Sequence, residues 1–576
     1  MKKIFYYLSL ILILYTVISC ENILNIENKV NITPDDVWND YKMANAYITN
    51  LYSMIVPGQS QNDGKSTDEA ATIYDGTMNS FLNGQATIDS WGSFENTYKL
   101  IRSINFVFPN LEKGSIPEDQ KKQIRGQALF FRAWLYWKMV KMAGGVPLIL
   151  EPQSQYDIEN IFLERTPTSE CINQIIKDLD EAISLLPSEW NSSEWNKVTS
   201  GIAMAVKGEV LLWWASPLFN PQNDAKRWTD AYNATKAAKD FLVTNNGRGL
   251  FKPYNDIWDT EGLQNEEVVF VRVYQFPGST YNQQGMRPLL YSQDAHDEDR
   301  PSLELVNAFP MKDGSKFDPN VIDYKNLHKN RDDRFYTTIA YNGSYPYLKE
   351  LIDGGWNMWT YRDGSFAADT KDGNLYSSTS FYRAKGIDKT VTQATRGQCG
   401  LDNIIIRFAE VLMNYGEASN GAGKPDEALN VLYQIRQRAG IEPGPDNKYG
   451  ITASNRAEIF NAYLEERQIE FAFEAKRWND IRRMRRFDVL RNVKQRHGLK
   501  ILLKTGMERP DRNANLDDVI DRFDYEVVNC DELKNLGIIN PKDEYYFMPI
   551  AKSDLDRNSN LKQTKGWDNG TFDPLL

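Results

Sequence analysis

The chain has 576 residues, of which 41% are hydrophobic and 25% charged, a composition typical of a globular protein and not of a disordered or fibrous one. Lys and Arg total 67 against 78 Asp and Glu, and the resulting net charge of −11 disfavours a general nucleic-acid-binding protein. Three scattered histidines and four cysteines without a C-x-x-C pair argue against a histidine-rich metal centre, a zinc ribbon and a thioredoxin-type redox pair.

The N-terminus has the pattern of an export signal. Two lysines at positions 2 and 3 precede a hydrophobic run over residues 4–18, which is too short to span a bilayer comfortably but suits a signal peptide. The run ends at Ser19 and Cys20, an arrangement that resembles a bacterial lipobox, in which the cysteine is acylated. We therefore expect residues 1–19 to be a lipoprotein signal peptide, Cys20 to carry the lipid, and the polar residues 20–35 to form a tether. Cleavage near Ser19 without lipidation is the alternative.

Helical periodicity dominates the rest of the chain, which we interpret as a single domain over residues 36–576. Apolar residues recur at i+3 and i+4 spacing both in an N-terminal part, 36–250, and in a C-terminal part, 401–576. The predicted helices cover residues 124–142, 168–186, 198–215 and 228–243, then 402–439 with a break at 421–425, and 454–487. Their Ala-rich pairs resemble tetratricopeptide packing, although the spacing is too irregular for a strict repeat.

Residues 251–400 have a different sequence pattern, in which short segments alternate with turns rich in Gly, Asp and Asn. The single clear strand signal is rich in valine and covers residues 267–275. The sequence thus predicts a helical scaffold with one large, loop-rich insertion. Long loops on a rigid scaffold are where binding sites usually lie, so we expect the ligand to bind there.

Six segments carry motifs that follow one another in order along the chain. They cover residues 125–148 (ending in GVPL), 165–187 (RTP, then a helix ending in LLP), 404–418 (IIIRFAEVL, then EA), 428–440 (AL, then IRQRAG), 465–483 (EER, EFAFE, then DIRR) and 549–563 (PI, then NLKQ). Together with the lipobox, this ordered set resembles the SusD/RagB family of nutrient-binding outer-membrane lipoproteins, over about residues 30–570.

The resemblance implies a mainly α, SusD-like fold with four tetratricopeptide-like helix pairs and a large irregular insertion that carries short strands. It also implies a cell-surface lipoprotein, anchored in the outer membrane by its lipid, that delivers a captured nutrient to a partner SusC-like TonB-dependent transporter. Most members bind oligosaccharides, so we expect an oligosaccharide or polysaccharide ligand, no catalysis and no cofactor. Some members bind peptides, and oligopeptide capture stays the alternative.

Tryptophan and tyrosine are concentrated in the predicted insertion. They total 44 of 576 residues in the chain but 12 of the 102 residues between 281 and 382. Both side chains present a flat apolar face with a polar edge, which suits the C–H face of a pyranose ring. The candidate stacking residues there are Tyr291, Trp356, Trp359 and Tyr361. The resemblance adds Asp68, Tyr74, Asp75 and Trp91, from the loop before a helix at about residues 98–108. For each of these residues, packing within the loops is the alternative to ligand contact.

Other charged segments have structural interpretations that we prefer. Glu and Arg lie on consecutive helical turns over residues 465–486, which favours structural ion pairs over a catalytic or nucleic-acid site. The acidic residues at 294, 297, 298 and 299 could bind calcium, but their spacing is not that of an EF-hand and favours a solvated loop. No H-E-x-x-H or G-x-S-x-G motif occurs, and a glycoside hydrolase, which needs only two carboxylates, is the less favoured alternative. Cys171, Cys399 and Cys530 are expected to be buried free thiols.

Overall fold

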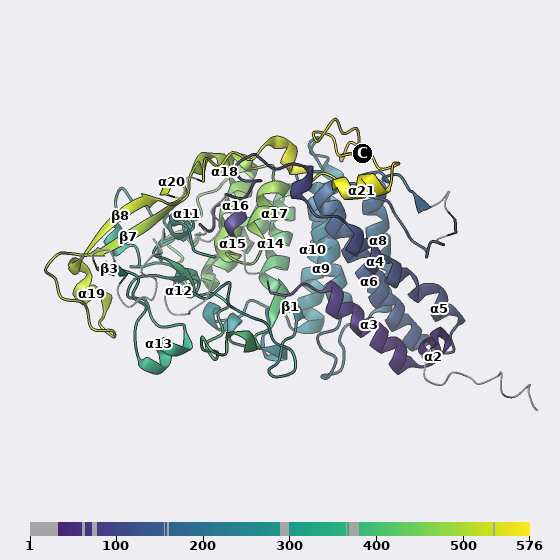
Figure 1. Cartoon of the computed structure of the whole chain (residues 1–576), viewed down its shortest axis with the longest axis horizontal. Helices are drawn as coiled ribbons and strands as arrows, with labels where there is room; N and C mark the ends of the chain where they lie inside the picture. Colours follow the sequence, from purple (N-terminus) through teal and green to yellow (C-terminus); the bar gives the residue numbers. More distant parts are fainter. Residues whose placement is uncertain are drawn as a thin grey trace, which may run out of the picture.

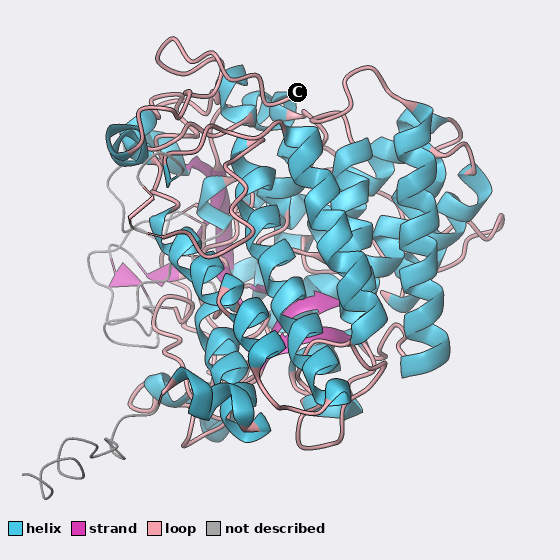
Figure 2. Ribbon diagram, turned by 90° about the vertical axis from the view of Figure 1, so that its right-hand side faces the viewer, coloured by secondary structure: helices cyan, strands magenta, loops and turns pink. Residues whose placement is uncertain are grey.

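Helices dominate the structure, a computed structural model that describes residues 33–59, 64–71, 78–154, 156–157, 161–288, 299–363, 366–367, 379–533 and 536–576 (Figure 2). The longer helices are α3 (Tyr41–Ile55), α4 (Glu95–Asn105), α6 (Glu118–Ala143), α8 (Thr168–Leu185), α9 (Ser200–Ala215), α10 (Ala225–Asn246), α14 (Phe408–Gly421), α15 (Pro425–Arg438) and α16 (Arg456–Glu470). Shorter helices are α2 (Pro34–Asn39), α5 (Val107–Lys113), α11 (Leu303–Ala308), α12 (Asp333–Thr338), α13 (Lys349–Gly354), α17 (Arg477–Arg483), α18 (Phe487–Val493), α19 (Leu516–Val519), α20 (Cys530–Leu533) and α21 (Lys552–Arg557). The signal peptide, Cys20 and nearly all of the predicted tether lie outside the described residues.

The strands are short and form three small sheets. They are β1 (Val268–Arg272), β2 (Ile339–Ala340), β3 (Arg362–Asp363), β4 (Phe366–Ala367), β5 (Tyr382–Arg383), β6 (Asn403–Arg407), β7 (His497–Leu503) and β8 (Phe523–Asn529). β1 pairs with β6, β2 pairs with β5, and the third sheet has the order β4–β3–β7–β8. The N-terminal helices occupy one end of the molecule and β3, β7 and β8 the other, with α14, α15, α16 and α17 between them (Figure 1).

The four helices predicted in the N-terminal part are confirmed as α6, α8, α9 and α10. α6 ends because Gly144 has a φ of 78°, a conformation that residues with a Cβ rarely adopt. α10 ends in the same way at Gly247, with a φ of 61°. α8 packs against both α6 and α9, and α9 packs against α10, so consecutive helices form one continuous layer.

The block expected to be helical from residue 402 begins instead with a strand, β6. It pairs antiparallel with β1, placing Ile404 opposite Val271 and Ile406 opposite Phe270. Three consecutive isoleucines at 404–406 favour an extended chain because β-branched side chains lose rotamer freedom in a helix. The helix α14 starts only at Phe408, after this pairing has ended.

Two further strands, β7 and β8, were not predicted. They pair antiparallel over seven residues each, from His497 opposite Asn529 to Leu503 opposite Phe523. Residues 504–522 separate them, so no short turn signal marks the pair as a hairpin. Their pairing is therefore visible only in the folded chain.

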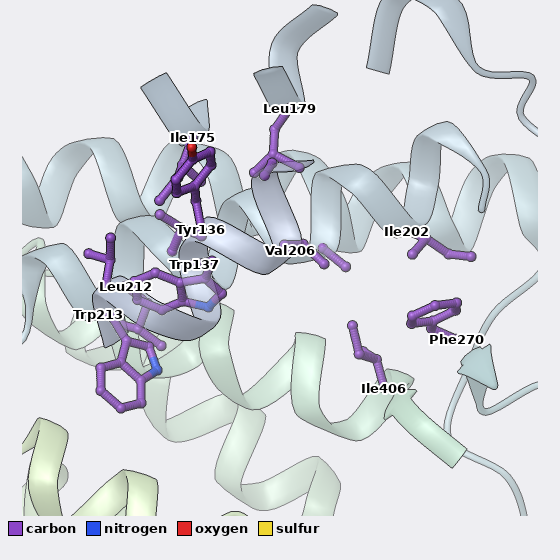
Figure 3. Packing of buried hydrophobic residues seen from close by; sticks show 14 of the residues in the cluster. Tyr136, Trp137, Ile175, Leu179, Ile202, Val206, Leu212, Trp213, Phe270 and Ile406 are labelled. Carbon is purple, nitrogen blue, oxygen red and sulfur yellow. The ribbon is translucent and has the colours of Figure 1, made fainter. Parts of the chain in front are cut away.

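The hydrophobic core has two main parts. In the larger one, the indoles of Trp137 and Trp213 meet edge to face with their centroids 5.6 Å apart, and Phe270 of β1 joins the helices (Figure 3). A second cluster, around Trp359 and Phe523, lies under the predicted insertion and the β7–β8 pair. The insertion is thus not only loops: it shares a hydrophobic core with the β7–β8 pair and the segment between them. The three thiols of Cys171, Cys399 and Cys530 are free and buried, as expected.

A buried ion network joins the helical part to the insertion. Its cations are Arg334, Lys385, Arg407, Arg436 and Arg438, and its anions are Glu267, Asp332, Glu466, Glu470 and Glu474. Glu470 is its centre: Arg407 Nη1 lies 2.6 Å from Oε1, Arg334 Nη1 lies 3.1 Å from Oε2, and Arg438 also contacts Oε1. The charges balance at five of each sign, which makes burial of so many ions tolerable.

The expected ion pairs of residues 465–486 are present, and several of their partners lie outside the segment. Arg477 pairs with Asp68 at 2.7 Å, and Arg483 Nη2 lies 2.8 Å from an oxygen of Glu417. Each partner comes from another element of the fold. The structural interpretation of this segment is confirmed: it forms ion pairs with other elements and also within itself, where Arg467 pairs with Asp480 at 2.8 Å.

Acid is expected to destabilise the fold through this network. Burial opposes the charged form of Glu466, Glu470 and Glu474, but the surrounding arginines outweigh it and hold each pKa below its ordinary value of 4.5. Because the folded pKa is lower than the unfolded one, the stabilisation is complete above pH 4.5 and is lost as the pH falls through the folded values. Burial raises the pKa of Asp332, so this group has the opposite effect on stability, but it is one carboxyl against three. The thermal midpoint, followed by circular dichroism, should fall steeply below pH 4.5; an unchanged midpoint down to about pH 3 would contradict this.

Candidate functional site

An open cleft of about 450 Å³, here called the tyrosine cleft, lies in the loop-rich part of the structure. Its aromatic wall consists of Trp258, Tyr336, Tyr341, Tyr345 and Tyr347. Its polar lining includes Asn255, Asp259, Ser344 and Lys389. All of these residues belong to the insertion predicted over 251–400. The cleft is therefore a place in the described structure where aromatic rings of the insertion come together, although none of them is a ring singled out from the sequence.

Helix α12 and strand β2 position the aromatic wall. The carboxylate of Asp332 caps α12 by accepting a hydrogen bond from Phe335 N at 3.0 Å. β2 follows α12 directly and is held by its pairing with β5. Tyr336 on α12 and Tyr341 after β2 consequently enter the same cleft from adjoining elements.

Two tyrosine rings are accessible to a ligand. Tyr345 is 87% exposed and Tyr336 is 43% exposed, whereas Tyr347 is buried. The Tyr336 hydroxyl donates a hydrogen bond to His328 O at 2.7 Å, which orients its ring. Tyr341 is half-buried and stacks on Phe335 with centroids 5.5 Å apart; burial raises its pKa. The cleft thus combines one oriented ring with one fully accessible ring.

Charged groups lie beside these rings. Lys389 Nζ and Asp259 Oδ2 form an ion pair of 2.5 Å with both side chains partly exposed, so they can also reach a ligand. Deeper, Lys385 is buried with its Nζ 2.6 Å from Glu474 and 4.7 Å from the Trp258 ring centroid. Burial, opposed by Glu474, lowers the pKa of Lys385 to about 8. Such groups can exchange hydrogen bonds with hydroxyls around a flat apolar face, and they need no covalent chemistry to do so.

Trp359 and Tyr361, two of the predicted stacking residues, belong to the core instead. They are 2% and 3% exposed. Trp359 donates from Nε1 to Arg512 O at 3.0 Å, and the Tyr361 ring packs on Phe523 with centroids 4.8 Å apart. With both ring faces covered there is no room for a sugar, so the expectation for these two residues is corrected: they hold the insertion together.

Trp356 remains accessible but lies outside the cleft lining. It is 37% exposed, and the guanidinium of Arg512 stacks 4.0 Å from its ring centroid. An arginine over an indole favours a fixed ring orientation. Trp356 is thus a single partly covered ring near α13 and does not share a cleft with the exposed tyrosines.

The residues predicted from the loop before α4 have mixed outcomes. Asp68 is buried and accepts two hydrogen bonds from Arg477, at 2.9 and 2.7 Å, so the expectation of ligand contact is corrected to a structural ion pair. Trp91 is half-buried and packs edge to face on Phe81, with centroids 6.3 Å apart. Tyr74, Asp75 and Tyr291 lie outside the described residues. So do the acidic positions 294, 297 and 298.

The described acid of the suggested calcium loop, Asp299, is not solvated. It is buried and lies 2.6 Å from Arg383, contrary to the expectation of an exposed side chain. Within the described ranges no three His, Cys, Asp or Glu side chains are grouped as a metal site. Among the helices described, none is both long enough and apolar enough to cross a membrane.

Sequence reasoning missed the two accessible tyrosines, Tyr336 and Tyr345. The signal for Tyr345 was present: an Asn-Gly-Ser turn at 342–344 is followed by Tyr345, Pro346 and Tyr347. An aromatic residue next to such a turn is more exposed than one within a continuous apolar run. Tyr336 carried no comparable signal, because its exposure depends on which face of α12 is covered.

The match to a family model decides which family the chain represents. The model of the SusD family matches residues 266–567, more than half of the chain. The chain belongs to the SusD family. A second SusD-like model, described as starch-binding and associating with the outer membrane, matches residues 23–212. The resemblance in the ordered motifs is thereby confirmed.

Similar proteins extend over most of the chain. A SusD-like protein of Formosa agariphila, P2, is 24% identical over 490 residues, which is 81% of this chain and 78% of the relative. A crystal structure of a SusD-like protein from Bacteroides fragilis superposes with a TM-score of 0.74 at 24% identity, covering 92% of this chain and 98% of the other. A laminarin-binding SusD-like protein superposes with a TM-score of 0.57 at 18% identity, covering 92% and 100%. These structures confirm the mainly α, SusD-like fold.

Proposed function

We propose that this chain is a surface lipoprotein that captures oligosaccharides in the tyrosine cleft and delivers them to a partner SusC-like TonB-dependent transporter. It binds and releases its ligand without catalysing a reaction. The observation that carries the proposal is the pair of accessible rings, Tyr336 and Tyr345, beside the Asp259–Lys389 ion pair in one open cleft. The lipobox at Cys20 and the second family model support the outer-membrane anchor.

The energetics of stacking favour an extended ligand. A sugar ring that covers roughly 60–80 Å² of apolar surface gains about 1.5–2 kcal/mol from each platform. One platform therefore binds weakly, and useful affinity requires several contacts along a chain of sugars. The cleft offers two accessible rings and several polar groups, which suits an oligosaccharide better than a monosaccharide.

Two relatives support the ligand class. One structural neighbour is a laminarin-binding SusD-like protein, and another is a SusD-like carbohydrate-binding protein from Bacteroides fragilis with a TM-score of 0.69 at 20% identity. Both share the fold, and their descriptions name laminarin for the first and carbohydrate for the second. We extend carbohydrate binding, but not a particular sugar or linkage, to this chain.

Replacing Tyr345 with alanine is expected to weaken oligosaccharide binding about tenfold, because one stacking platform is lost. The mature protein would first be screened on a glycan array, and the best ligand titrated calorimetrically into native protein, Tyr345→Ala and Tyr345→Phe. Tyr345→Phe keeps the ring and should retain most of the affinity. Tyr345 is exposed, so neither change should disturb the fold.

Trp356→Ala is the matched control, since Trp356 is an exposed aromatic residue outside the cleft lining. Affinity lost in Trp356→Ala and kept in Tyr345→Ala would place the ligand away from the tyrosine cleft. A native protein that retains no glycan but enriches peptides from a random library would replace this proposal with oligopeptide capture.

A further inference from the structure

A second cavity, with a largely different lining from that of the tyrosine cleft, lies between helices α6, α9, α14 and α17. Its volume is about 300 Å³, the size of one or two small rings. At one corner it is lined by Lys138 and Lys141 from α6, by Glu209 from α9 and by Lys476 just before α17. We call this corner the lysine corner. Among the described residues, only Trp258 and segment 385–386 line both cavities.

The lysine corner carries more positive than negative charge. Lys476 Nζ lies 2.8 Å from Glu410, and Lys141 Nζ lies 3.5 Å from Glu209. Lys138, at the exposed mouth, has no hydrogen-bond or ion-pair partner among the described residues. Three ammonium groups thus face two carboxylates, and one positive charge has no counter-ion.

The neighbouring charged groups do not supply that counter-ion. Asp480, which also lines the cavity, pairs with Arg467 at 2.8 Å and with Arg483 at 3.1 Å. Glu261 and Asp402 line the cavity from the loops next to β6; burial raises the pKa of both. Asp402 already accepts a hydrogen bond from Tyr274 N at 3.0 Å.

Within the described structure, Glu209 pairs with Lys141 alone, so Lys138 stands beside a second lysine on the same face of α6 without an anion of its own. Lys138 and Lys141 are three residues apart, a spacing at which like charges on a helix repel. Desolvation and the ammonium of Lys141 both lower the pKa of Lys138. A bound anion would relieve this repulsion.

The wall beside the lysines is flat and apolar. Trp134, Leu212 and Trp213 line the cavity next to them. The Trp213 indole is held in place by its edge-to-face contact with Trp137 (Figure 3). Lys141 Nζ lies 5.5 Å from the Trp213 ring centroid. A ligand with a flat apolar face and one anionic group would match the Trp134 indole and the ammonium groups together.

We propose that this cavity binds a ring compound that carries a single carboxylate or sulfate group, with the anion at Lys138 and Lys141 and the ring against the half-buried indole of Trp134. This proposal is independent of glycan capture in the tyrosine cleft and would hold even if no glycan bound there. A sugar acid and a non-sugar aromatic acid share this chemistry, and the experiment distinguishes them.

The test titrates the mature protein calorimetrically with D-glucuronate, with benzoate and with D-glucose as the uncharged ring. We expect one of the two acids to bind and glucose not to bind. Lys138→Gln should weaken the acid about tenfold, and Lys138→Arg, which keeps the charge, should restore binding. Lys122→Gln, an exposed lysine on the same helix outside the cavity, should bind as the native protein does.

Each result of these titrations has a different interpretation. Binding of glucuronate assigns the cavity to sugar acids, and binding of benzoate alone assigns it to other ring acids. If neither acid binds, if glucose binds equally well, or if Lys138→Gln binds like the native protein, the proposal is overturned. Circular dichroism of each variant shows whether the fold is intact, and Lys138 is exposed enough for the fold to be kept.

Discussion

Glu470→Gln is expected to lower the free energy of unfolding by about 3–5 kcal/mol, the range for breaking a buried ion pair from one side. Glu470 is buried and contacts Arg334, Arg407 and Arg438. A neutral amide would leave these three guanidinium groups short of one negative charge in a site that water cannot reach. The amide would also present hydrogens to groups that only donate, so hydrogen bonds would be lost together with charge.

The measurement is urea unfolding followed by tryptophan fluorescence, with Glu465→Gln as the control. Glu465 lies on the same helix, but its ion pair with Lys316 is exposed, with side-chain exposures of 55% and 80%. Its replacement should cost no more than about 1 kcal/mol. Similar losses in the two variants would show that the network contributes no more than a surface pair.

Asp68→Asn is expected to lower the free energy of unfolding by about 3 kcal/mol while leaving oligosaccharide affinity unchanged. Arg477 makes two hydrogen bonds to the Asp68 carboxylate, and Gln468 donates a third at 3.3 Å. These contacts join residues about 400 positions apart in the chain, so losing them should loosen the N-terminal loop from α16 and α17. The affinity prediction follows because Asp68 is buried.

Urea unfolding and calorimetric titration of the same Asp68→Asn sample test both halves of this prediction. Asp89→Asn is the control, an exposed acid nearby in the sequence whose replacement should change neither quantity. Normal stability with lost glycan binding would show that Asp68 is a ligand contact, as its sequence position first suggested.

Local patterns predicted the helices well because their causes are local. The apolar stripe of α6 and the glycines after it depend on residues within a few turns of one another. β6 was mistaken for the start of a helix because its pairing partner, β1, lies about 130 residues earlier in the chain. The β7–β8 pair was missed for the same reason, since residues 504–522 separate the two strands.

The exposure of individual aromatic rings was not predictable from the sequence. Enrichment in tryptophan and tyrosine directed attention to the insertion, where the tyrosine cleft lies. Composition did not reveal that Trp359 is buried against Phe523 while Tyr345 is almost fully exposed. Both are aromatic residues in turn-rich surroundings, and only the packing of distant segments decides which ring faces solvent.

The sequence by itself determined the family and the helical scaffold and predicted an export signal, because each depends on short motifs or on periodicity within one segment. Only the tertiary structure decided which charges pair and which rings are accessible. Glu470 has partners from α12, β6 and α15, and Asp68 has one from α17. Burial and electrostatic pairing are sums over neighbours in space, and those neighbours come from parts of the chain whose separation carries no local signal.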